Sequence, residues 1–174
     1  MSLERDIHQR VFRNEYQKAI LNILHTQNFI VGLMTEVFRP HGITRQQYNV
    51  LRILRGQYPE SASINLIKNR MLEKMSDTSR IVERLRIKGL IERAHGSADK
   101  RSVEISITQA GLKLLKTMRN PVENIESVLD NLSHEEVQEL NNLLDKITSR
   151  SLADDGVVHA PAAPAELSFS KPIR

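Results

Sequence analysis

The segment from Ser76 to Thr108 constrains the fold of this chain more than any other. It begins with a serine, a residue that often caps helices, and its apolar residues then recur at helical spacing. Gly89 follows, and glycine readily takes the left-handed conformation in which many helices end. Two strand-like runs come next, over residues 90–93 and 103–107, with a charged tip rich in turn formers between them. The segment therefore predicts a helix followed directly by a β-hairpin.

The predicted helix has two unlike faces. Its apolar face carries Ile81, Val82 and Leu85. Its opposite face carries Asp77, Arg80 and Arg84. A helix with a polar, arginine-bearing face, followed at once by a basic hairpin, has the layout of a winged helix-turn-helix. An ordinary solvated helix face is the alternative interpretation of the same pattern.

Positive charge is concentrated around this segment. The whole chain has a formal net charge of only +4, which is compatible with a polyanionic partner without demonstrating one. Between Lys68 and Arg101, however, ten basic residues stand against five acidic ones. The distribution of charge favours nucleic-acid binding more than its total does.

The flanking segments have the pattern of amphipathic helices. Residues 4–38 contain no proline and keep a helical apolar period, which predicts one helix roughly 50 Å long. Residues 110–150 carry a second apolar stripe, with a bend or restart at Pro121 and a capping box formed by Ser133 and Glu136. So much apolar surface predicts a homodimer in which the terminal helices of two subunits interlock. Residues 151–174 lose the pattern and are expected to form a flexible tail.

Two further helices are predicted between the first flank and the Ser76 segment. Thr44 and Gln47 have the spacing of a capping box, and either Ser61 or Ser63 begins a shorter helix. We therefore expect a mainly α fold with a small β-hairpin wing. A winged helix-turn-helix would cover residues 43–108, flanked by dimerisation helices over residues 5–38 and 110–150.

These motifs resemble the MarR family of bacterial regulators. Residues 43–54 are similar to the second helix of that family, and residues 79–93 to its recognition helix and first wing strand. The most specific match is the run Asp99-Lys100-Arg101, which is followed by Val103, Ile105, Thr108 and Gly111 as in the wing of the family. The resemblance covers residues 5–150. It departs from the family at residues 70–75, where the small residues common in the turn are missing.

The resemblance implies a homodimeric repressor that binds a pseudo-palindromic operator in double-stranded DNA. The recognition helix would enter the major groove, where Arg80 or Arg84 would contact guanine. The Asp77 carboxylate would accept a hydrogen bond from a cytosine amino group or stabilise the amino end of the helix electrostatically. The hydroxyl groups of Ser76 and Ser79 would form hydrogen bonds to bases or phosphates.

The wing and the nearby lysines have separate implied roles. Arg101 would reach into the minor groove while Asp99 holds its guanidinium group in place. Phosphates would be contacted by Lys68, Arg70, Lys74 and Lys100. An ordinary charged hairpin tip is the alternative for the wing.

The resemblance also implies release from DNA by a small, often aromatic or phenolic, effector. Candidate lining residues are His41, Tyr48 and Arg52, although Tyr48 at its position also suits the hydrophobic core. The chain has no cysteine, which excludes sensing through a thiol. Its six histidines have no metal-ligand spacing, so neither a metal nor a cofactor is expected.

Other classes of protein are less compatible with the sequence. It contains no phosphate-binding glycine loop, nucleophile elbow or His-Glu-x-x-His motif, so we do not expect an enzyme. A winged-helix protein-interaction or antirepressor module without direct DNA binding stays open, because a fold alone does not define a function. The chain shows no apolar signal region and no long apolar run, so a cytoplasmic location without a membrane partner is expected.

Overall fold

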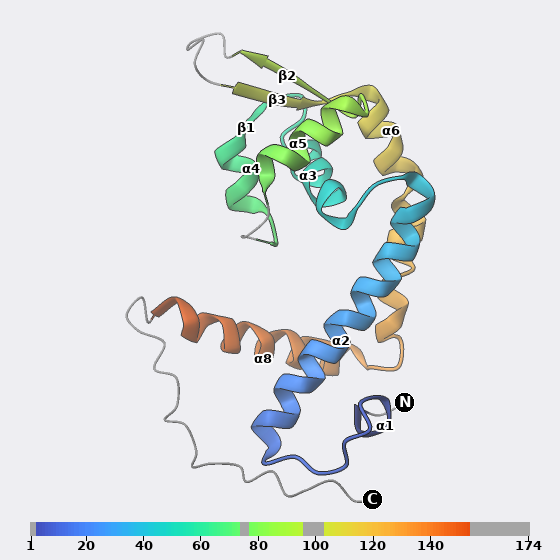
Figure 1. Ribbon diagram of the computed structural model, residues 1–174, viewed down its shortest axis with the longest axis vertical. Coiled ribbons are helices and arrows are strands. Elements are labelled where there is room, and N and C mark those ends of the chain that lie inside the picture. The colour runs from blue at the N-terminus through green and yellow to red at the C-terminus, as the bar shows by residue number, and fades with distance from the viewer. Residues whose placement is uncertain (1–2, 74–76, 96–102, 154–174) are drawn as a thin grey trace, which may run out of the picture. The chain divides into compact units, whose positions relative to one another are not determined.

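The computed structural model describes residues 3–73, 77–95 and 103–153, which form a mainly helical chain with one small sheet (Figure 1). The chain divides into two compact units after Val128. The larger unit contains the N-terminal helices, the winged helix-turn-helix and the short helices that follow it. The second unit contains helix α8, His134–Ala153. The predicted fold class is confirmed.

The N-terminal segment is not the single helix that the sequence predicted. Helix α1 spans only Leu3–Asp6, and helix α2 begins anew at Glu15 and ends at Phe38. The restart has a local cause, because Asn14 Oδ1 accepts from the Gln17 amide at 2.9 Å. Gln17 Oε1 in turn accepts from the amide of Arg13 at 2.7 Å. These bonds satisfy amides of a helix start, so the helix expected over residues 5–38 covers only residues 15–38.

The winged helix-turn-helix follows the short 3₁₀ helix η1, Arg39–His41. Its elements in chain order are α3 (Arg45–Arg55), β1 (Ala62–Ser63), α4 (Ile64–Arg70), α5 (Thr78–Ile87), β2 (Ile91–His95) and β3 (Val103–Ile107). The predicted capping box of Thr44 and Gln47 begins α3, and Ser63 rather than Ser61 caps α4. Gly89 takes the left-handed conformation after α5, with φ +68°, as its position predicted.

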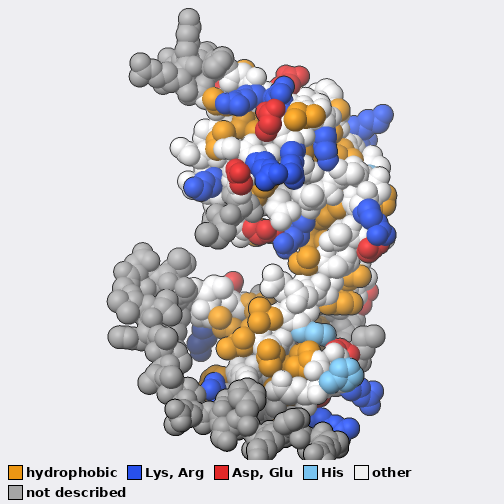
Figure 2. All heavy atoms as spheres, in the orientation of Figure 1, with side chains coloured by type: hydrophobic (Ala, Val, Ile, Leu, Met, Phe, Trp, Pro, Cys, Tyr) orange, Lys and Arg blue, Asp and Glu red, His pale blue; other side chains and the backbone are white. Residues whose placement is uncertain are grey.

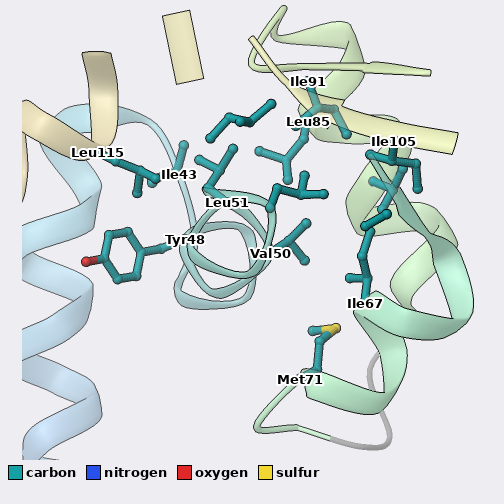
Figure 3. Close-up of a cluster of buried hydrophobic side chains, with 14 of the residues drawn as sticks. Ile43, Tyr48, Val50, Leu51, Ile67, Met71, Leu85, Ile91, Ile105 and Leu115 are labelled. Carbon is teal, nitrogen blue, oxygen red and sulfur yellow. The ribbon is translucent and has the colours of Figure 1, made fainter. Parts of the chain in front are cut away.

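One hydrophobic core joins these elements, and α3 lies at its centre (Figure 3). Val50, Leu51 and Leu54 of α3 are at most 1% exposed. Packed around them are side chains from α4, α5, the sheet and the following helix: Ile67, Val82, Leu85, Ile91, Ile105, Ile107 and Leu115. The Tyr48 ring stacks on Phe38 with 4.9 Å between ring centroids, which attaches the end of α2 to this core.

The sheet is antiparallel and has the strand order β1-β3-β2. Strands β2 and β3 form the predicted hairpin, with Arg93 opposite Ile105. On its other side Ile105 pairs with Ala62 of β1. The sequence did not predict β1, because two residues are too few to show a periodic pattern.

The segment after the sheet begins with α6, Gln109–Thr117, which Thr108 caps. Gly111 lies so close to the hairpin that a Cβ atom there would collide with the Leu90 carbonyl oxygen and come within 2.7 Å of Ile107 Cγ1. Two short helices follow, α7 (Arg119–Glu123) and the 3₁₀ helix η2 (Glu126–Leu129). The restart expected near Pro121 is therefore present in α7.

Helices α2 and α8 both expose apolar side chains. On α2 these are Tyr16, Ile20, Ile23, Leu24 and Phe29. On α8 they are Leu140, Leu143, Leu144 and Ile147. The predicted capping box begins α8, since Ser133 Oγ accepts from the Glu136 amide at 3.2 Å and Glu136 Oε2 accepts from the Ser133 amide at 2.8 Å. Within the described ranges, no helix is long and apolar enough to cross a membrane.

Candidate nucleic-acid interface

Helix α5 begins at an aspartate. Asp77 Oδ1 accepts from the Arg80 amide at 3.1 Å, so this carboxylate is the helix cap. The prediction that Ser76 caps the helix is wrong, and Ser76 itself lies outside the described residues. A negative charge at this point also suits the positive end of the helix dipole. Of the two roles considered for Asp77, support of the helix amino end is thus observed.

The two faces of α5 separate as the sequence predicted. Thr78, Val82 and Leu85 are buried, whereas Ser79, Arg80 and Arg84 are exposed. The polar face borders a cavity of about 260 Å³ lined by Asp77, Arg80, Ile81 and Arg84 of the α5 region and by Thr44, Gln46 and Gln47 at the start of α3. The structure therefore brings three predicted DNA-binding residues, Asp77, Arg80 and Arg84, to one concave surface.

Arg86 differs from the other two arginines of α5. Its guanidinium group donates to both carboxylate oxygens of Glu83, at 3.0 and 2.8 Å. This hydrogen bonding lowers the pKa of the Glu83 carboxyl group and raises the pKa of the Arg86 guanidinium. Arg86 is therefore engaged within its own helix, which makes it a natural control for Arg80 and Arg84.

The predicted phosphate-binding residues are only partly described. Lys68 and Arg70 lie exposed in the last turn of α4. The other predicted residues of this surface, Lys74, Asp99, Lys100 and Arg101, lie outside the described residues. Figure 2 shows several Lys and Arg side chains on the face of the winged helix-turn-helix, interspersed with fewer acidic ones.

A larger cavity of about 670 Å³ lies on another side of α3, between this helix, α6 and α7. Two of the three predicted effector residues, Tyr48 and Arg52, line it, and Arg52 Nη1 donates to Tyr48 Oη at 3.1 Å. His41 is not among the lining residues. The rest of the lining comes from Arg55, Leu112, Leu115, Lys116, Arg119, Val122, Glu123 and Glu126.

The cavity lining is more cationic than the sequence revealed. Arg55, Lys116 and Arg119 join Arg52 there, against the two carboxylates of Glu123 and Glu126. One of those carboxylates is already used, because Arg119 Nε donates to Glu123 at 3.0 Å. Lys116 and Arg119 were not predicted, since they lie on α6 and α7, far from α3 in the chain, while Arg55 on α3 itself was overlooked. Among the described residues, no group of three or more His, Asp or Glu side chains could hold a metal ion.

Comparison with known proteins agrees with this arrangement. Residues 43–111 match the family model described as a winged helix DNA-binding domain. A curated relative, the transcriptional repressor MprA of Escherichia coli, is 25% identical over 90% of this chain and 93% of its own length. The HTH-type transcriptional regulator MgrA of Staphylococcus aureus is 30% identical over 64% of this chain and 74% of its own length.

Solved structures extend the match over more than three quarters of the chain. A MarR transcription factor from Planctomyces limnophilus is 33% identical, with a TM-score of 0.61, and the match covers 78% of this chain and 98% of that one. A mutant of Escherichia coli MarR in complex with operator DNA is 26% identical, with a TM-score of 0.69, over 79% and 99% of the two chains. The winged helix match and these relatives, all of them transcription factors, thus define a DNA-binding transcriptional regulator rather than an enzyme.

The chain belongs to the MarR family of transcriptional regulators. Two structural neighbours below 25% identity share its fold and are described together with small molecules. One is BpsR of Bordetella bronchiseptica, regulated by 6-hydroxynicotinic acid, at 23% identity, a TM-score of 0.64 and 75% and 98% of the two chains. The other is RdhR-CbdbA1625 bound to 2,4-dichlorophenol, at 17% identity, a TM-score of 0.73 and 83% and 88% of the two chains.

Proposed function

We propose that this protein is a homodimeric repressor that binds a pseudo-palindromic operator through α5 and its wing, and that a small organic acid releases it. The observation that carries the proposal is the division of α5. Its buried face is anchored by Val82 and Leu85, while Arg80 and Arg84 stand exposed beside the start of α3. An arginine can donate two hydrogen bonds to the major-groove edge of guanine, which makes these two residues the proposed base-reading groups.

Phosphate contacts would position the protein without reading sequence. We assign this role to Lys68, Arg70, Lys74 and Lys100. The wing contact is assigned to Arg101, with Asp99 as its orienting partner, on the match to the wing of the family. Because a repressor acts where its operator DNA is, the proposal also places the protein in the cytoplasm.

The proposed dimer rests on the apolar residues that one chain leaves exposed. Tyr16 and Ile20 of α2 are 83% and 60% exposed, and Ile147 of α8 is 58% exposed. Exposed apolar surface of this kind on a helix often marks an interaction site, and a second copy of the chain would cover these residues on each helix by twofold symmetry. A twofold axis would then present two α5 helices to half-sites about one turn of DNA apart.

A double variant tests the dimer. Ile20→Asp with Leu24→Asp should convert a sedimenting dimer to a monomer at micromolar concentration, because two carboxylates would be buried without partners. The control is Asn22→Asp, which adds a carboxylate to the same exposed stretch of α2. A double variant that still sediments as a stable dimer would contradict an interface through α2.

The proposed effector site is the cavity between α3, α6 and α7. Its cations Arg52, Arg55 and Lys116 favour an anionic ligand, and Tyr48 supplies an aromatic wall and a hydroxyl group. An aromatic carboxylic acid combines both features. Suitable probes are 6-hydroxynicotinic acid and the neutral-to-weakly acidic 2,4-dichlorophenol.

The effector proposal is tested by competition with DNA. The aromatic acid should release the wild-type protein from its operator at a lower concentration than the phenol does, and Arg52→Ala should weaken that release while leaving operator affinity in place. The proposal fails if neither probe releases DNA nor shifts the thermal unfolding temperature.

DNA reading is tested with a matched pair of variants on α5. Arg84→Ala should weaken binding to a selected operator by about tenfold or more, the loss expected for one bidentate contact to guanine. Arg86→Ala should leave affinity nearly unchanged, because Arg86 is paired with Glu83. Fluorescence anisotropy at several salt concentrations measures both. Equal losses in the two variants would point to general electrostatics, and no salt-dependent binding at all would favour a protein-interaction module.

A further inference from the structure

Helix α5 is held near both ends by one short stretch of α3. At the carboxyl end of α5, Lys88 Nζ donates to Gln47 Oε1 at 3.2 Å. The same ammonium group also donates to the carbonyl oxygen of Gly42, at the junction that leads into α3. Lys88 is the C-cap residue of α5, so this contact joins the end of the helix to the start of α3.

The other contact lies just before the amino end of α5. Glu73 forms an ion pair with Arg45 at 2.5 Å and accepts from Gln46 Nε2 at 3.0 Å. The amide of Leu72, the residue before Glu73, donates to Asn49 Oδ1 at 3.2 Å. Leu72 and Glu73, which follow α4, are therefore held by side chains from the first five residues of α3, Arg45 to Asn49.

The Gln47 side chain makes the contact between the start of α3 and the end of α5 rigid. Its side chain is 3% exposed, and its amide oxygen accepts both from Lys88 and from the Thr44 amide, at 3.1 Å. A buried amide that serves two donors has little freedom to rotate, because moving it would leave polar groups unsatisfied. The capping box of α3 and the end of α5 therefore share one oxygen atom.

We infer that the first turn of α3 is a clamp that fixes the position and angle of α5 against DNA. The clamp consists of Arg45, Gln46 and Gln47 on α3, together with their partners Glu73 and Lys88. Gln47, Glu73 and Lys88 are then positioning residues: they act on base reading through the helix they hold. This inference rests on DNA binding through α5 and does not depend on the proposed dimer or effector.

Misplacing a recognition helix has a characteristic consequence. Hydrogen bonds to base edges demand accurate geometry, whereas contacts between mobile lysines and phosphates tolerate small shifts. Loosening the clamp should therefore weaken specific binding and leave non-specific binding almost unchanged. A residue that itself touches a phosphate behaves differently, because its loss lowers the slope of log affinity against log salt by about 0.9.

The central variant is Lys88→Met, which keeps the length of the side chain and removes the donor. The matched control is Lys113→Met, the same change at an exposed position on α6. The probes are a duplex that the wild-type protein selects from a random-sequence library and a scrambled duplex of equal length. We expect Lys88→Met to lose about tenfold in affinity for the selected duplex, the effect of one charge-assisted hydrogen bond, with unchanged salt slope and unchanged scrambled binding.

Two further measurements separate positioning from general damage. Lys88→Arg keeps a cationic donor and should restore most of the lost affinity. Hydrogen exchange should speed up in α5 of Lys88→Met and stay unchanged in α6. Glu73→Gln keeps the acceptor for Gln46 and loses the ion pair to Arg45, so its loss of affinity should be smaller.

Clear outcomes would overturn the inference. A salt slope reduced by about 0.9, with equal losses on both duplexes, would make Lys88 a phosphate contact instead. Full affinity in Lys88→Met, in Glu73→Gln and in the combination of the two would show that the clamp has no role in DNA reading. If Lys88→Met loses stability, Lys88→Gln tests the same link, because it removes the charge and shortens the side chain, and full affinity of this variant for the selected duplex would overturn the inference.

Discussion

Helices α3 and α2 belong to the same compact unit and yet use their apolar residues in opposite ways. Leu51 of α3 is completely buried among side chains from several other elements, whereas Leu24 of α2 is 49% exposed. The C-terminal end of α2 is the exception, because Phe38 is buried and stacks on Tyr48. The winged helix-turn-helix thus completes its core within one chain, while most of α2 has apolar surface to cover. From this contrast we expect folding of the winged helix-turn-helix to be separable from the proposed assembly of two chains.

The largest effect that tests this contrast is expected from two leucine truncations. Leu51→Ala should lower the free energy of unfolding by roughly 2–5 kcal/mol, because it leaves a cavity in a packed core. Leu24→Ala should cost only about 1 kcal/mol in the single chain, since half of the side chain is already in water. Urea denaturation at two protein concentrations measures both. An equal, concentration-independent loss in the two variants would break the contrast.

A pair of glycines sharpens the contrast at a smaller scale. Gly111→Ala should destabilise the protein by about 1–3 kcal/mol, because its Cβ would collide with the backbone at Leu90. Gly32→Ala in α2 meets no atom within 4 Å and should stabilise the helix by about 0.5–1 kcal/mol. Thermal unfolding distinguishes the two signs. A destabilising Gly32→Ala would indicate that another surface packs closely on α2 at this point.

The smallest expected effect concerns the two helix caps. Thr44→Ala removes the capping box of α3 and should cost about 1 kcal/mol of global stability. Asn14→Ala removes the cap of α2, whose first turns can fray without opening the core, so its global cost should be about a few tenths of a kcal/mol. Hydrogen exchange by residue would show the loss at Asn14 confined to the start of α2. Equal global costs would mean that the start of α2 unfolds together with the winged helix-turn-helix.

Local signals account for what the sequence predicted well. Thr44 with Gln47, Ser133 with Glu136 and the left-handed Gly89 all act within a few residues of themselves, so their chemistry is visible in the sequence. The same kind of signal was overlooked at Asn14 and Gln17, where a cap interrupts an otherwise helical apolar pattern. At the start of α5, four adjacent residues, Ser76 to Ser79, are all suited to capping, and the choice of Asp77 depends on how the helix docks.

Features built from distant segments could not be predicted in this way. Strand β1 exists only because Ala62 pairs with Ile105, and a pattern of two residues cannot predict that partner. Arg55, Lys116 and Arg119 meet only when α3, α6 and α7 pack together. The contact of Lys88 with Gln47 likewise joins residues 41 positions apart. The exposed polar face of α5 was predictable because it lies on one helix, whereas the cavity and the contact between Lys88 and Gln47 each need residues from several elements.

The separation of faces on α5 has a consequence for how such a regulator can change. Ser79, Arg80 and Arg84 contribute little to the core, while Thr78, Val82 and Leu85 hold the helix in place. Under the proposed function, substitutions on the exposed side would therefore alter which DNA is recognised at little cost in stability, provided that the cap at Asp77 and the contact at Lys88 are kept. A designer, or natural selection, could redirect the protein to a new promoter by exploring three positions and leaving the rest of the scaffold untouched.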